Sequence, residues 1–346
     1  MNQPSAVKTS LFAAEEREQR LDKKGDLLSV LEKHVNFKNL AVEVDRIAPR
    51  SVNPKGGRPP YPTELMVRIL ILQHLYKLSD EAMEYQLLDR LSFQRFCGLR
   101  HSSSIPDEKT LWVFRERVRE AGGSDALFDA VQQQLQQHGY IARGGQIIDA
   151  TLVESPKQHI RKADKDILIQ EATPANWTPA QRRQKDTQAS WTKKHGKSHH
   201  GYKLSISADR KYKLIRKRRV STAKEHDTRH FEGVLDSSNT SCDVWADKGY
   251  EDKEREQRLN GNGWRMNIQR KAKRGKPQSD CQKRRNTRIA SPRARVEHVF
   301  GAMAALGKKP LRTIGLARAE FGLSMQAAVY NLQRLCTLKE QGITDF

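Results

Sequence analysis

The chain has 346 residues with 63 Lys and Arg against 41 Asp and Glu, a formal net charge of +22, and only 36% hydrophobic and 7% aromatic residues. This excess of positive charge favours a polyanionic partner, nucleic acid or an anionic membrane surface, because cations set against phosphates release condensed counterions. No stretch reaches the roughly 18 consecutive apolar residues of a membrane span, and the start lacks the apolar segment of a secretory signal. We therefore expect a soluble, cytoplasmic protein.

The charge is unevenly distributed along the chain. Residues 1–150 carry 21 Lys and Arg against 20 Asp and Glu, which leaves 42 against 21 for the remainder. The length is compatible with two domains or with one domain and an insertion, and the charge asymmetry favours two, at residues 1–140 and 141–346. The four scattered cysteines form no C-x-x-C pair, so neither a disulfide framework nor a thiolate zinc site is indicated.

The neutral first part has helical apolar spacing. The period predicts a helix from about Thr63 to Lys77 whose apolar stripe is Leu65, Ile69, Leu72 and Tyr76. Ser79 and Asp107 are placed to cap two further helices, and a short helix is expected around Leu28. This part is predicted to be a small all-helical domain.

A Gly-Arg-Pro sequence lies between these helices. Gly57, Arg58 and Pro59 resemble a minor-groove hook, in which an extended Arg reaches the floor of an A·T-rich groove. The same residues are typical of a turn that leads into the next helix, which is the interpretation we favour. Arg58 is therefore a candidate DNA contact with a structural alternative.

The basic second part begins with a short apolar run, Gln146 to Val153, that is typical of a central strand. Asp149 interrupts this run. A carboxylate in a buried strand costs several kcal/mol unless it is paired or bound to a metal. Asp149 is thus either a ligand or a residue that caps a turn.

A polar, basic segment at about 155–198 follows and is interpreted as an insertion. Residues 200–208 and 212–220 then alternate in hydrophobicity around a tight turn, which predicts a hairpin. Its expected exposed side carries Arg216, Lys217, Arg218 and Arg219, for which phosphate contact and simple solvation are both open.

Two further acids follow. Asp247 ends a short apolar run at 243–246, and Glu297 lies beside the apolar stripe of a helix that we expect to begin at Ser291 and Pro292. A helix at 251–259, a strand at 264–268 and a mobile basic loop at 269–295 are expected between them. Arg293 lies four residues before Glu297, close enough to touch it on a helix. The final helix, from about Phe321, is expected to cover the core.

This order of elements spreads three carboxylates over a mixed α/β unit, which is the ribonuclease H-like pattern. The predicted fold class is therefore α/β: a ribonuclease H-like catalytic domain, a mixed sheet with helices, preceded by a small all-helical domain. Three converging carboxylates repel one another unless cations neutralise them, and oxygen ligands suit Mg²⁺ or Mn²⁺. Two such ions would support in-line attack on a phosphodiester, which predicts phosphoryl transfer on DNA.

His226 and His230 offer a competing metal interpretation, because their spacing suits zinc ligands on one helix face. No cysteine or acidic cluster accompanies them, and their surroundings are strongly cationic. We expect them along a DNA path or at the surface.

Four blocks of sequence together resemble the signature blocks of bacterial DDE insertion-sequence transposases, in the group numbered five. The blocks are Ile148-Asp149-Ala150-Thr151, Gly201-Tyr202-Lys203, Ala246-Asp247-Lys248-Gly249-Tyr250 and Arg293-Ala294-Arg295-Val296-Glu297-His298-Val299-Phe300-Gly301. The resemblance extends from about Asp26 to Leu338, and the helical first part is similar to the amino-terminal domain of that group.

The resemblance implies that Asp149, Asp247 and Glu297 bind two Mg²⁺ or Mn²⁺ ions in a nucleoid-associated bacterial enzyme. Such an enzyme binds inverted repeats at the ends of its element, cuts there, and joins the freed 3′-hydroxyl to target DNA, as a homodimer or larger assembly. The candidate contacts to double-stranded DNA are Arg58, Lys203, Arg216, Arg218, Lys248 and Arg293.

Two positions depart from the pattern of the wider group. Ala290 stands where Tyr is common, and Ala304 stands where Lys is common, so Lys308 or Lys309 would have to replace that phosphate contact. The missing Lys keeps open a ribonuclease H-like nuclease that cuts without joining. A catalytically inactive DNA-binding repressor is a further alternative.

Overall fold

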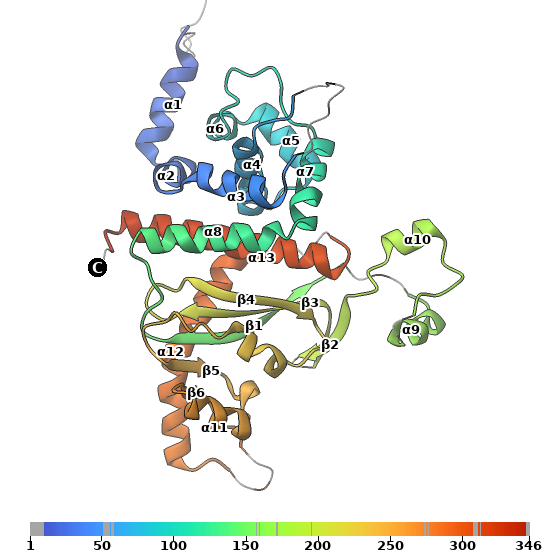
Figure 1. Cartoon of the computed structure of the whole chain (residues 1–346), viewed down its shortest axis with the longest axis vertical. Helices are drawn as coiled ribbons and strands as arrows, with labels where there is room; N and C mark the ends of the chain where they lie inside the picture. Colours follow the sequence, from blue (N-terminus) through green and yellow to red (C-terminus); the bar gives the residue numbers. More distant parts are fainter. Residues whose placement is uncertain are drawn as a thin grey trace, which may run out of the picture.

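The structure is a computed structural model that describes residues 10–50, 56, 59–156, 158, 160–170, 172–194, 196–272, 275, 277–306, 311 and 313–343. Arg58, Lys308 and Lys309 lie outside the described residues, so their predicted roles stay predictions. Figure 1 shows a helical region stacked on a twisted sheet, with long helices between and behind them.

The helical region contains α1 (Ala13–Lys24), α2 (Leu27–His34), α3 (Phe37–Ile47), α4 (Thr63–Tyr76), α5 (Asp80–Asp89), α6 (Leu91–Phe96), α7 (Glu108–Glu120) and α8 (Gly123–Gln137). The predicted caps are present. The Ser79 hydroxyl accepts the N–H of Ala82 at 3.2 Å, and the Asp107 carboxylate accepts the N–H of Thr110 at 2.7 Å. Each cap satisfies a backbone donor that the first helical turn leaves free. The helices predicted here are confirmed.

The sheet consists of β1 (Gln146–Glu154), β2 (Ser190–Lys194), β3 (Lys197–Asp209), β4 (Ile215–Thr222), β5 (Asp243–Ala246) and β6 (Arg265–Ile268). Its strand order is β2-β3-β1-β5-β6, and β4 also pairs with β3. Strands β1, β5 and β6 are parallel to one another, whereas β3 is antiparallel to β1, β2 and β4. This mixed sheet with flanking helices confirms the ribonuclease H-like fold class.

The remaining elements are α9 (Lys162–Ile169), α10 (Pro179–Gln184), α11 (Lys253–Gly261), α12 (Asp280–Ala305), α13 (Leu316–Glu340) and the 3₁₀ turns η1 (Asp227–His230), η2 (Glu232–Val234) and η3 (Lys248–Tyr250). Helices α9 and α10 and strand β2 belong to the predicted insertion, and the two helices project from one side of the sheet in Figure 1.

The long helix α12 corrects the sequence prediction. We expected a loop through residue 295 and a helix start at Ser291 and Pro292, but α12 begins at Asp280 and contains Pro292 in its interior. Ser279 and Gln282 form a capping box at the true start. Ile289, Val296, Val299 and Met303 of this helix are buried, so packing outweighs its polar composition.

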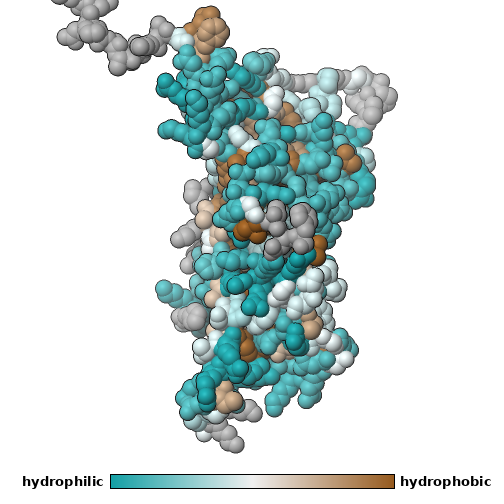
Figure 2. All heavy atoms as spheres, turned by 90° about the vertical axis from the view of Figure 1, so that its left-hand side faces the viewer, coloured by the Kyte–Doolittle hydropathy of each residue, from teal (hydrophilic) through white to brown (hydrophobic). Residues whose placement is uncertain are grey.

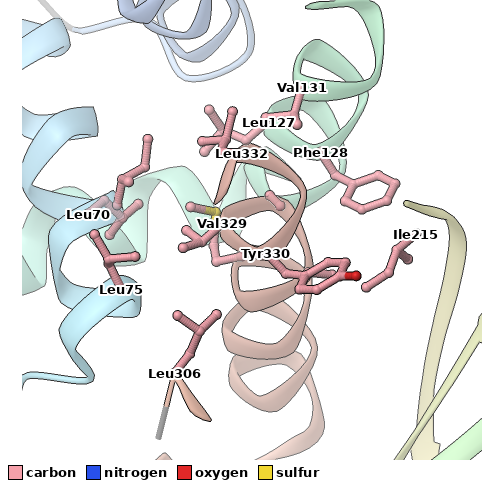
Figure 3. Packing of buried hydrophobic residues seen from close by; sticks show 14 of the residues in the cluster. Leu70, Leu75, Leu127, Phe128, Val131, Ile215, Leu306, Val329, Tyr330 and Leu332 are labelled. Atoms are coloured by element: carbon pink, nitrogen blue, oxygen red, sulfur yellow. The ribbon is translucent and has the colours of Figure 1, made fainter. Parts of the chain in front are cut away.

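The hydrophobic core is continuous between the helical region and one face of the sheet. Helix α13 packs on α8, α4 and β4, and Figure 3 shows its Val329, Tyr330 and Leu332 between residues of α4, α8 and β4. The prediction that the final helix covers the core is confirmed. A smaller apolar cluster, which includes Phe231, Val244 and Tyr250, lies on the other face of the sheet.

The face of the molecule in Figure 2 is mainly hydrophilic, with apolar atoms scattered among polar ones. Within the described part of the chain, no helix has both the length and the apolar character that a membrane crossing requires.

Candidate active site

Strand pairing sets two of the predicted acids beside each other. Strand β1 is parallel to β5, with Ile147 opposite Trp245. Asp149 and Asp247 each lie two residues beyond this pair. Because side chains two residues apart share a face of a sheet, the two carboxylates occupy neighbouring positions on one face. Asp149 lies within β1 rather than at its end, since β1 continues to Glu154 along β3.

The turn after β5 fixes the orientation of Asp247. Asp247 caps η3, and its Oδ1 accepts the N–H of Gly249 at 2.6 Å. A Cβ on residue 249 would lie 2.7 Å from that same oxygen, so only glycine allows this close approach. The turn therefore holds one carboxylate oxygen of Asp247 and leaves the other for a ligand.

Helix α12 brings the third acid to the same region, because it packs across β1 and β5. Arg293 and Glu297 lie one turn apart on this helix. Arg293 donates from Nη1 to Asp149 Oδ2 at 3.1 Å and from Nη2 to Glu297 Oε1 at 3.5 Å. The structure thus connects Asp149 to Glu297 through a guanidinium, and the Glu297 side chain is 68% exposed.

The surroundings of Asp149 disfavour its charged form. Burial raises the pKa of Asp149, and the charge of Asp247 adds to this effect. The Ala150 N–H and the Arg293 guanidinium oppose the shift but do not cancel it. A group with these properties gains strongly from a nearby cation.

The donor set fits a hard divalent cation, since it offers carboxylate oxygens and no sulfur or imidazole. As arranged, however, the described residues contain no group of three His, Cys, Asp or Glu side chains spaced to hold a metal ion. The Arg293 guanidinium contacts both Asp149 and Glu297 in this arrangement.

The sequence alone did not point to a further set of residues near the acids. The hydroxyl of Tyr250, a residue only 1% exposed, has no hydrogen-bond partner among the described residues. Burial raises the pKa of Tyr250, and the charges of Asp227, Asp149 and Asp247 add to this effect. Arg255 donates to backbone carbonyls of Thr228 and Tyr250 and thereby joins η1 to η3.

Lys203 lies in a strand, and its sequence position could have indicated a buried carboxylate partner, which is Asp227 in the structure. A lysine inside an alternating strand needs a carboxylate partner when it is buried. Lys203 is buried and its Nζ lies 2.6 Å from Asp227 Oδ1 and donates to the Glu225 carbonyl at 2.6 Å. It has internal partners, so the assignment of Lys203 as a DNA contact does not agree with its position.

The hairpin arginines also need correction. Arg216 is buried, not exposed: its guanidinium pairs with Asp209 at 3.1 Å and donates to the Tyr140 carbonyl at 2.9 Å. Arg218 packs over the Phe128 ring, and its Nη2 lies 2.5 Å from Asp125 Oδ1. The prediction that Arg216 lies on the exposed side of the hairpin is wrong, because β4 packs against α13 and the helical region.

The remaining candidates lie where a ligand could reach them. Lys248 is exposed directly after Asp247, and Arg293 is partly exposed.

His226 contacts Thr228, and His230 contacts Glu225 at 3.0 Å. These two histidines therefore have partners other than a metal.

A cavity of about 280 Å³ lies away from these acids, between α4, α7 and α13. Its lining includes His74, Arg115, Arg119 and Arg318. Asp80 and Glu116 pair with the arginines, so the cavity is part of the contact between the helical region and α13.

Comparison with known proteins identifies the family of this chain. The family model described as "Transposase domain (DUF772)" matches residues 15–117, and the model described as "Transposase DDE domain" matches residues 142–332. A solved structure, a cryo-EM structure of a piggyBac transposase synaptic complex with hairpin DNA, is similar with a TM-score of 0.47 and 11% identity, covering 92% of this chain and 76% of that chain. The DDE model spans more than half of the chain, which therefore belongs to the DDE transposases, enzymes of phosphoryl transfer on DNA.

Proposed function

We propose that this transposase belongs to the insertion-sequence group numbered five, binds the terminal inverted repeats of its element, cuts there, and joins the 3′-hydroxyl to target DNA. One observation carries the proposal: the β1–β5 register sets Asp149 beside Asp247, and α12 crosses both strands with Glu297. This arrangement lies within the residues that match the DDE domain.

Asp149, Asp247 and Glu297 would hold two Mg²⁺ or Mn²⁺ ions. When bound, such ions activate the attacking oxygen and stabilise the leaving one in an in-line displacement. The partly buried position of Asp149 favours this role, because burial raises its pKa and such a carboxylate gains from a nearby cation. The orphan hydroxyl of Tyr250 is placed to donate to a carboxylate or a water of the loaded site.

The exposed cations at the edge of this site would hold the DNA. Lys248 directly follows Asp247 and is free to contact a phosphate near the cut. Arg293 would contact a phosphate once its carboxylate partners are taken by metal. We place the boundary of the catalytic domain at residue 141 and its basic insertion at about 155–198, and we expect at least a dimer on paired DNA ends.

The test compares the wild type with Asp149→Asn, Asp247→Asn and Glu297→Gln on a labelled duplex of the element's own end with Mg²⁺. Each substitution keeps the size of the side chain and removes its charge. We expect loss of cleavage and joining by about a thousandfold or more, because each acid is needed for the metal pair. Circular dichroism and thermal unfolding check that the variants remain folded.

The products separate the alternatives. Cleavage with a joined product supports the transposase. Cleavage without joining would identify a nuclease, which the Ala304 position leaves open. Equal activity of wild type and all three variants would leave only a DNA-binding repressor.

A further inference from the structure

The Arg293 side chain lies between Asp149 and Glu297, two acids that a metal ion would have to reach. Its two terminal nitrogens contact different carboxylates, Asp149 on β1 and Glu297 on α12. The contact is accessible: the Arg293 and Asp149 side chains are 21% and 19% exposed. Among the described residues, no second cationic group forms an ion pair with either carboxylate.

The need for a cation here is electrostatic. Asp149 on β1 and Asp247 directly after β5 are like charges, and such a pair is unfavourable unless a positive group lies close by. Arg293 supplies that charge from the protein itself. The Asp149 oxygen that accepts from Arg293 is Oδ2, while Oδ1 accepts the Ala150 N–H. Oδ2 is therefore the oxygen for which a metal ion and the guanidinium compete.

We propose that Arg293 is a displaceable internal counter-ion of this site. Its guanidinium and divalent cations compete for Asp149 and Glu297, and a DNA phosphate that attracts the guanidinium frees both carboxylates. This inference rests on the proposed function, which assigns these acids to metal binding. It adds a positioning role, because Arg293 determines when Glu297 can join Asp149 and Asp247.

The proposal has a thermodynamic consequence. If phosphate and carboxylates compete for one guanidinium, DNA binding must strengthen metal binding, and metal must strengthen DNA binding by the same factor. Removal of the guanidinium should remove most of this coupling. An arginine that only oriented Glu297 would act in the opposite sense, since its loss would weaken metal binding.

The experiment titrates Mn²⁺ into the full chain without DNA, by calorimetry, for wild type, Arg293→Ala and Arg293→Gln. Arg288→Ala is the matched control, because Arg288 is an exposed arginine of the same helix. It lies nine residues before Glu297, which is two and a half turns and so the opposite side of the helix. Thermal unfolding shows whether each variant is folded, and the Gln variant retains a hydrogen-bonding side chain if the Ala variant is unstable.

We expect both Arg293 variants to bind Mn²⁺ about tenfold more tightly than wild type, since a competing charge in contact with the ligands is lost. Arg288→Ala should match wild type. In the presence of a duplex of the element's end, Mn²⁺ binding should tighten for wild type and Arg288→Ala but change little for the Arg293 variants.

Unchanged or weaker Mn²⁺ binding in the Arg293 variants would overturn the inference while leaving the proposed function intact. Asp149→Asn distinguishes the two failures. If wild type and Asp149→Asn gave the same Mn²⁺ titration, the assignment of the metal site would itself be wrong, and the role of Arg293 would fall with it.

Discussion

Two aspartate–arginine pairs have their aspartates on the paired strands β1 and β3 and differ in what surrounds them. Asp209 lies opposite Gln146 at the start of β1 and pairs with Arg216; Asp149 lies three residues further along β1 and pairs with Arg293. The first pair is enclosed, with side chains 0% and 4% exposed. The second is reached by solvent and shared with Glu297.

The two pairs differ in the other hydrogen bonds that their side chains make. Asp209 also accepts the N–H groups of Tyr212 and Leu214, and Arg216 also donates to the Tyr140 carbonyl, so every partner comes from the protein. Asp149 accepts from the Ala150 N–H and from Arg293, and Glu297 accepts from Arg293, so both acids could accept a ligand in place of the arginine. The first pair holds the hairpin against the helical region, and the second is suited to exchange.

The largest predicted effect concerns stability. Arg216→Ala leaves the Asp209 charge buried and uncompensated, and we expect a loss of about 3–5 kcal/mol in the free energy of unfolding. Arg293→Ala removes a solvent-accessible contact and should cost less than about 1 kcal/mol. Denaturant unfolding at pH 7 measures both. Equal losses would remove the distinction between an enclosed and an exchangeable pair.

His74 extends the comparison to the enclosed helical region. Burial lowers its pKa from 6.5 to about 4, followed by the charges of Arg115 and Lys77. A folded-state pKa below the unfolded value means that stability is complete above pH 6.5 and is lost as the pH falls toward 4. Because His74 retains some exposure, we expect a loss of at most about 2 kcal/mol.

Unfolding midpoints of wild type and His74→Gln between pH 7 and pH 4.5 test this sign. The wild type should lose stability more steeply than the variant over this range. Parallel curves would show that His74 is already charged or solvated in the native protein.

Lys203→Met tests the second enclosed cation. Its loss leaves Asp227 without its ion-pair partner and frees the Glu225 carbonyl. We expect about 1–2 kcal/mol of destabilisation, because Asp227 is partly exposed and water compensates in part. Nonspecific DNA binding should keep its salt dependence, since Lys203 contacts protein groups.

The smallest effect is expected for Lys248→Ala. The affinity for DNA falls as salt rises, and loss of one phosphate contact should make this dependence shallower: the magnitude of the slope of log affinity against log salt should fall by about one unit. Little change in stability is expected. Filter binding of a labelled duplex over a range of salt concentrations measures the slope. If the salt dependence became shallower for Lys203→Met and stayed unchanged for Lys248→Ala, the assignment of internal and DNA-facing cations would be reversed.

Much of the fold could be predicted because its signals are local. Caps such as Ser79 and the apolar run that forms β1 depend on neighbouring residues, and they were interpreted correctly. Helix α12 was misjudged at its start, since its composition is basic and polar and its stability comes from packing against distant strands. Pro292 was interpreted as a helix start, whereas its position inside a helix depends on that same tertiary support.

The site was less predictable than the fold. The blocks around Asp149, Asp247 and Glu297 could be recognised, but a single sequence gives no orientation for a side chain. Arg216 and Lys203 look like DNA contacts in the sequence because the partners that bury them, Asp209 and Asp227, are found only in three dimensions. The same holds for the bridge that Arg293 makes between β1 and α12.

Anomalous scattering from crystals of the protein grown with Mn²⁺ and a duplex of the element's end tests the central claim most directly. We predict Mn²⁺ between the carboxylates of Asp149 and Asp247, with Glu297 turned in as a third ligand. Mn²⁺ bound elsewhere, with Glu297 remote from the two aspartates despite bound DNA, would contradict it.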